Sequence, residues 1–210
     1  MCKSSDPSLS SFNIRLLITL NILQYNVYIS IIGPVNEQKN IITVSRITPD
    51  KGLDILIRAF ASIVKTNPNW TLEIIGEVSD SGYYKELLQL IDEIGISEKV
   101  KFLGLLTRKQ LIDKYRASSI FCLASRHESF AISRLEAISL GMYVITTTAG
   151  CAKDFSEYGA HIVPIGDIKA MERALRDGVK FFESGKPNTT NNKKIPSYLD
   201  LASIISDVNF

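Results

Sequence analysis

Short apolar runs alternate with longer amphipathic stretches along most of this chain. From residue 41 onward the runs are rich in Ile, Val, Leu and Phe, and the stretches between them repeat apolar residues at helical spacing. The pattern predicts strands at 41–44, 71–75, 100–102, 120–123, 144–146 and 161–163, and helices at 53–64, 83–94, 108–117, 132–140 and 168–182. Continuous apolar strands that alternate with amphipathic helices are typical of a parallel sheet covered on both faces. The sequence therefore predicts a doubly wound α/β domain.

The first of these helices shows how its faces are assigned. Its apolar residues recur every three or four positions and are expected to face the sheet: Leu53, Leu56, Ile57, Phe60, Ala61 and Val64. The charged residues Asp54, Arg58 and Lys65 are expected to point outward. Asn67-Pro68 then ends the helix, because the residue before a proline disfavours helical backbone.

The two ends of the chain lie outside this regular pattern. Residues 14–32 are apolar, but one charged and three amide side chains interrupt them: Arg15, Asn21, Gln24 and Asn26. A membrane-spanning helix needs ~20 mostly apolar residues, so we expect no transmembrane span here and predict a helix at 12–24 and a strand at 26–32. Peripheral membrane association stays open. The chain is thus divided into an amino-terminal remnant (1–36), one domain (37–184), a polar loop (185–196) and a terminal helix (197–210).

Composition narrows the class of protein. With 210 residues and 45% hydrophobic content, the chain can bury one substantial core but is too short for two doubly wound domains. The net charge is +2, and positive and negative residues are interspersed along the chain. The sequence therefore shows no basic cluster of the kind that binds nucleic acid. The three cysteines are not spaced as metal ligands or as a redox pair, and Cys122 lies inside an apolar strand. This pattern indicates a reducing, cytoplasmic location. Only two histidines are present, which disfavours a zinc site.

Two glutamates follow the apolar run Ile120-Phe121-Cys122-Leu123. Glu128 is expected on the loop at the end of this strand, and Glu136 about a turn and a half into the next helix. Open α/β sheets bind ligands at the carboxyl ends of their strands. Acidic residues are seldom placed there for packing alone, so the pair is a candidate site.

Two cations follow the strand predicted at 41–44 in the same way. Arg46 and Lys51 lie on the loop between that strand and a helix that begins near Gly52. A planar guanidinium and a point-like ammonium can converge on a diphosphate. The sequence therefore predicts an anion site on this loop.

The order of these residues resembles a known family. The residues concerned are Ser45-Arg46-Ile47, then Lys51-Gly52 after three further residues, and much later the two glutamates. Their types and order resemble the donor-binding half of a retaining glycosyltransferase of the GT-B fold, family 4. The resemblance runs from about residue 40 to about residue 207, with further matches at 70–76, 100–104, 141–146 and 159–167. It implies a Rossmann-like carboxy-terminal domain of such an enzyme, preceded by an incomplete amino-terminal segment.

The resemblance also implies roles for individual residues. Arg46 and Lys51 would stabilise the leaving diphosphate, and Glu128 would bind the donor sugar beside the developing positive charge. Glu136 would accept hydrogen bonds from the ribose hydroxyls. The backbone amides at the start of its helix would face the phosphates: those of Ser129, Phe130, Ala131 and Ile132.

The same family implies a nucleotide-sugar donor and no metal cofactor. An acceptor-binding domain would come from another chain or from a longer product. The family usually has glycine at the position of Ala131, and often at that of Ser129, where the backbone approaches the donor. Three readings stay open: the donor half of a hexosyl transferase, a nucleotide-sugar-binding module without turnover, and an unrelated doubly wound protein.

Overall fold

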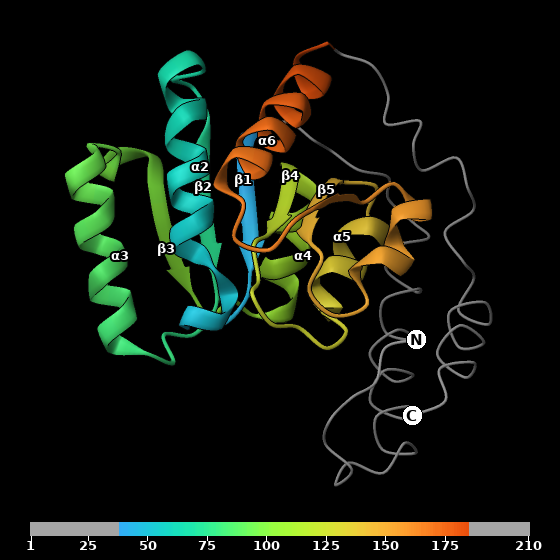
Figure 1. Ribbon diagram of the computed structural model, residues 1–210, viewed down its shortest axis with the longest axis horizontal. Helices are drawn as coiled ribbons and strands as arrows, with labels where there is room; N and C mark the ends of the chain where they lie inside the picture. Colours follow the sequence, from blue (N-terminus) through green and yellow to red (C-terminus); the bar gives the residue numbers. More distant parts are fainter. Residues whose placement is uncertain (1–37, 185–210) are drawn as a thin grey trace, which may run out of the picture.

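The computed structural model describes residues 38–184 (Figure 1). The predicted amino-terminal helix and strand, the polar loop and the terminal helix lie outside the described residues. The boundaries proposed for them are therefore kept as predictions.

The described residues form one parallel sheet. It consists of six strands in the order β3-β2-β1-β4-β5-β6. The strands are β1 (Gln38–Val44), β2 (Thr71–Ile75), β3 (Val100–Gly104), β4 (Ser118–Leu123), β5 (Tyr143–Thr147) and β6 (His161–Val163). Every predicted strand is present, and all neighbouring pairs are parallel. The predicted doubly wound α/β fold is confirmed.

Helices cover both faces of the sheet, as Figure 1 shows. One face packs against α2 (Leu53–Thr66), α3 (Ser81–Ile94) and α6 (Ile168–Glu183). The other packs against α4 (Arg108–Ala117), α5 (Ile132–Ser139) and the 3-10 helix η3 (Ala152–Tyr158). Two shorter 3-10 turns, η1 (Pro49–Lys51) and η2 (Ser97–Lys99), precede α2 and β3. The sequence pattern did not predict the three 3-10 elements, because they are too short to show a period.

Local capping signals set the starts of several helices. Asp80 accepts a hydrogen bond from the backbone N–H of Tyr83 at the start of α3, and Asp167 does the same for Ala170 in α6. At α4, Thr107 and Gln110 form a reciprocal capping box. Each contact satisfies a backbone donor that the first helical turn leaves open. The helices therefore begin within two residues of their predicted positions.

The apolar face of α2 packs as the pattern predicts, with one exception among its charged residues. Leu56, Ile57 and Phe60 are fully buried, while Arg58 and Lys65 are exposed. The prediction that Asp54 points outward is wrong. Its carboxylate is half-buried because an arginine from the loop after β4 reaches it.

The strand order reverses between β1 and β4. The chain builds β2 and β3 on one side of β1, then crosses over and builds β4, β5 and β6 on the other side. Ligands of open α/β sheets bind in the crevice at such a switch point. Here the loops after β1 and β4 touch: a Cβ added to Gly52, which has φ of 61°, would lie 2.2 Å from the carbonyl oxygen of Ala124. Only glycine allows this approach.

Candidate functional site

A lysine and a glutamate meet across the switch point. Lys51 Nζ, at the end of η1, lies 2.7 Å from Glu128 Oε1, on the loop after β4. The Ser125 hydroxyl lies 3.2 Å from the same oxygen, and Asp50 Oδ2 lies 3.3 Å from Lys51 Nζ. Both side chains of the pair are 12% exposed, so water screens their attraction only in part. The structure thus brings together two of the predicted site residues that are 77 positions apart.

Arg46 lies on the loop between β1 and η1 and is exposed. Its charge reaches the neighbouring carboxyl of Asp50. Burial raises the pKa of Asp50, but the Thr48 hydroxyl, Lys51 and Arg46 outweigh it and hold the pKa below its ordinary value. Two cations therefore flank one ionised carboxylate on the β1 side of the switch point.

The loop after Glu128 leads into α5 without a side-chain cap. Ala131 occupies the N-cap position with φ of 57° and ψ of 76°, and no side chain there accepts from the first turn of the helix. It is the one non-glycine residue with positive φ in the described part of the chain. Uncapped amides and the helix dipole favour an anion at this end of α5. Ser129 and Ile132 are exposed beside it.

Phe130 differs from its neighbours because its ring belongs to the core. The ring packs edge-on against Phe155 of η3, with centroids 5.7 Å apart. Its carbonyl accepts a hydrogen bond of 2.7 Å from Arg134, which is fully buried and lies over the Phe155 ring. Phe130 can therefore offer a ligand its backbone amide, not its ring.

Glu136 is held by two residues of α4. Its Oε1 accepts from Arg108 Nη1 at 3.1 Å, and its Oε2 accepts from the Tyr115 hydroxyl at 2.8 Å. Glu136 is 8% exposed, and Tyr115 is fully buried. Sequence reasoning missed both partners. Tyr115 reads as an apolar-face residue of a helix and Arg108 as a helix-start cation, so neither gave a signal of its own.

The start of η3 supports the Glu128 loop from the β5 side. The backbone N–H of Cys151 donates to the Ser129 carbonyl at 3.3 Å. A Cβ at Gly150 would lie 2.4 Å from that carbonyl oxygen and 2.6 Å from the Glu128 carbonyl oxygen. Glycine is therefore required at this position for the loop to keep its course.

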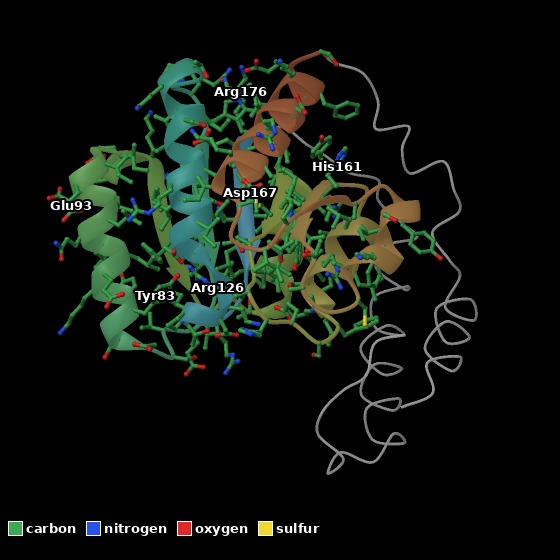
Figure 2. The ribbon with its side chains drawn as sticks, viewed as in Figure 1. Tyr83, Glu93, Arg126, His161, Asp167 and Arg176 are labelled. Carbon is green, nitrogen blue, oxygen red and sulfur yellow. The ribbon has the colours of Figure 1, made fainter. Side chains whose placement is uncertain are left out.

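A second set of contacts joins the loops after β1 and β4. Arg126 donates from Nη1 and Nη2 to the two oxygens of Asp54, at 2.9 and 2.7 Å. Tyr83 donates to Asp54 Oδ1 at 2.7 Å. Burial raises the pKa of the Asp54 carboxyl, but these bonds outweigh it and hold the pKa below its ordinary value. Figure 2 shows Arg126 near the start of α2 and Tyr83 between this end of α2 and the neighbouring helix α3. The sequence pattern missed this network as well.

The geometry suits an anionic ligand with hydroxyl groups. The Lys51–Glu128 pair and the uncapped start of α5 lie at the switch point, and a second carboxylate, Glu136, follows about one turn into α5. Within residues 38–184, no group of three or more His, Cys, Asp or Glu is placed to hold a metal ion. No helix in the same span is long and apolar enough to cross a membrane.

Fold and side-chain geometry together define a doubly wound α/β domain with a candidate polar site at its topological switch point. Within that class, residues 27–182 match the family model of the glycosyl transferases group 1. The chain therefore belongs to this glycosyltransferase family.

Curated relatives match along part of their length. D-inositol 3-phosphate glycosyltransferase of Mycolicibacterium smegmatis is 37% identical over 123 residues, which cover 58% of this chain and 27% of that protein. Mannosylfructose-phosphate synthase of Agrobacterium fabrum is 30% identical over 130 residues, which cover 60% and 29%. The chain thus spans little more than a quarter of the length of these relatives.

Solved structures share the fold. Anabaena Alr3699/HepE in complex with UDP is 25% identical, with a TM-score of 0.62 over 90% of this chain and 48% of that one. The C-terminal domain of LpcC, a glycosyl transferase group 1 family protein of Francisella tularensis, is 24% identical, with a TM-score of 0.64 over 82% and 87%.

Proposed function

We propose that this chain is the carboxy-terminal, donor-binding half of a retaining family 4 glycosyltransferase of the GT-B fold. It binds a nucleotide-diphosphate sugar without a metal and serves hexosyl transfer to an acceptor held by another domain. The observation that carries the proposal is the contact of 2.7 Å between Lys51 and Glu128 across the switch point.

The proposed roles follow the charges of the site. In retaining transfer, negative charge grows on the leaving diphosphate while the sugar becomes oxocarbenium-like. Lys51, Arg46 and the amides from Ser129 to Ile132 stabilise the diphosphate, and Glu128 binds the sugar. Such interactions accelerate transfer because they strengthen as the charge develops. Glu136 accepts hydrogen bonds from the ribose hydroxyls. At one of its oxygens, a ribose hydroxyl replaces Arg108 as the donor.

A solved relative supports the choice of donor. Anabaena Alr3699/HepE, 25% identical to this chain, was crystallised with UDP and with UDP-glucose. A nucleoside diphosphate has the negative charge for Lys51 and the hydroxyl groups for Glu136.

Calorimetry tests the binding step. The purified chain is titrated with UDP, GDP and ADP, each with and without a chelator. We expect at least one of the three to bind equally well in both conditions. Binding that disappears with the chelator would contradict the metal-independent site, and no binding of any nucleotide would contradict the proposal.

The alternative function is a nucleotide-sugar-binding module without turnover. Positioning of two substrates supplies ~7–11 kcal/mol of barrier lowering, and a donor half alone lacks the partner that holds the acceptor. We therefore expect no transfer from UDP-, GDP- or ADP-sugars by this chain alone. Turnover that depends on Glu128 would show that the chain rebuilds a complete cleft.

A further inference from the structure

We propose that Arg126, Asp54 and Tyr83 form a positioning unit that sets the spacing of Lys51 and Glu128. The proposal rests on the proposed function, because it assigns this spacing to binding of the donor diphosphate and sugar. None of the three residues is itself assigned a contact with the donor.

The contacts of Arg126 bracket the Lys51–Glu128 pair on the β1 side. Its guanidinium donates to the Pro49 carbonyl at 2.6 Å and to both oxygens of Asp54. Its backbone N–H donates to the Asp50 carbonyl at 2.7 Å. The side chain of Arg126 thus contacts residues before and after Lys51. Arg126 itself is two positions before Glu128 in the sequence.

Tyr83 fixes the carboxylate that holds Arg126. The hydroxyl of Tyr83 donates to Asp54 Oδ1 at 2.7 Å and accepts from the backbone N–H of Asp54 at 3.1 Å. Burial and the bond to Asp54 raise the pKa of Tyr83 to about 12, so the hydroxyl stays protonated and remains a donor at neutral pH. The unit therefore joins α3, α2 and the loop after β4.

The geometry distinguishes this unit from an ordinary surface ion pair. The side chains of Arg126 and Asp54 are 34% and 29% exposed, and their contact is a bidentate fork. A bidentate pair fixes orientation as well as distance. Both terminal nitrogens of Arg126 point to protein acceptors, so its fork is already used in holding the loop.

Spacing matters because the two sides of the site come from separate loops. A displacement of about 1 Å at a reacting site can cost up to about a hundredfold in rate. Without the fork, Lys51 and Glu128 would keep their charges but lose a fixed separation. The expected loss falls on the diphosphate and sugar, while Glu136, held by α4, still binds the ribose.

Arg126→Gln tests this selectivity. We compare its calorimetric affinities for the diphosphate and the monophosphate of the base that binds best to the unaltered chain. The ratio of diphosphate to monophosphate affinity is expected to fall about tenfold, with the monophosphate affinity almost unchanged. Arg126→Lys, which keeps the charge without the fork, should recover part of the ratio.

A double-mutant cycle shows whether the residues act together. Asp54→Asn should lower the ratio as Arg126→Gln does, and the double variant should lose little more than either single variant. Lys114→Gln is the matched control. It breaks the ion pair between Lys114, whose side chain is 31% exposed, and Glu73, whose side chain is 8% exposed. It should lower stability and leave the ratio unchanged.

Crystal structures of the unaltered chain and of Arg126→Gln give a readout that needs no ligand. The contact of Lys51 with Glu128 should be kept in the first and lost in the second. Its retention, or an unchanged affinity ratio in folded Arg126→Gln, would overturn the positioning role. If the unaltered chain binds no nucleotide, the proposed function fails, and the crystal structures still decide whether Arg126 sets the spacing.

Discussion

Two glutamates, one inside the sheet and one at its carboxyl edge, are each paired with a lysine, in different surroundings. Glu73, in the middle of β2, accepts from Lys114 of α4 at 2.9 and 3.0 Å and from Asn40 of β1 at 3.3 Å. Asn40 also donates to Ser118 of β4. At the carboxyl end, Glu128 and Lys51 meet beside the uncapped start of α5.

The difference separates a pair that holds the fold from the pair that we propose receives a ligand. All four residues of the Glu73 cluster lie on helices or strands, so their positions follow from the packing of the sheet. Glu128 lies on a loop and Lys51 ends a single 3-10 turn, with open backbone donors nearby. Removal of the first pair should cost stability, and changes around the second should cost binding.

Lys114→Gln should have the largest effect on folding. It leaves the Glu73 carboxylate, 6% exposed, without its cation, and breaking such a pair should lower the free energy of unfolding by about 2–3 kcal/mol. Urea unfolding measures the change, and nucleotide affinity measured well below the unfolding midpoint should not change. A variant that folds normally but binds weakly would break the comparison.

Glu136→Ala should have the largest effect on binding. Loss of a charged acceptor to the ribose should weaken affinity by roughly 1.5–3 kcal/mol, about ten- to a hundredfold. The stability cost should be below about 1 kcal/mol, because the Tyr115 hydroxyl also reaches the Ser133 carbonyl at 3.3 Å. Calorimetry and thermal unfolding separate the two effects. Tyr115→Phe, which removes the hydroxyl alone, is the control. Unchanged affinity with a large loss of stability in Glu136→Ala would make Glu136 structural.

Gly150→Ala tests whether the Glu128 loop must keep its course. Both Gly150 and Gly166 have positive φ, 61° and 78°, but a Cβ at Gly166 meets no atom within 4 Å. Alanine should therefore strain the backbone at both positions by roughly 1–2 kcal/mol, and only Gly150→Ala should also weaken nucleotide affinity, by about tenfold. Equal affinities in the two variants would show that the contact with the loop is dispensable.

Ala131→Gly should have the smallest effect. Relief of the left-handed backbone gains roughly 1–2 kcal/mol, and the greater freedom of glycine in the unfolded chain offsets about 0.4–1 kcal/mol of it. The free energy of unfolding should rise by about 0.5–1 kcal/mol. Denaturant unfolding measures the rise. A loss of stability would contradict the strain assigned to Ala131.

Most of the fold could be predicted because its signals are local. The fully apolar run of β4 and the repeat of Leu56, Ile57 and Phe60 in α2 reflect burial of whole strands and of one helix face. Caps such as Asp80 and Thr107 lie within three residues of the backbone groups that they satisfy. Local sequence therefore fixes these elements and their bounds to within a few residues.

The candidate site could be predicted only in part, because some of its signals are local and others are not. The sequence by itself determined that Lys51, Glu128 and Glu136 follow strands of a doubly wound sheet, and hence that they gather at its carboxyl edge. Only the tertiary structure decided which side chains meet. Arg126 reaches Asp54 from 72 positions away, and Arg108 reaches Glu136 from 28. Such pairings depend on the order of the strands and on side-chain directions across two loops, and no local period in the chain encodes either.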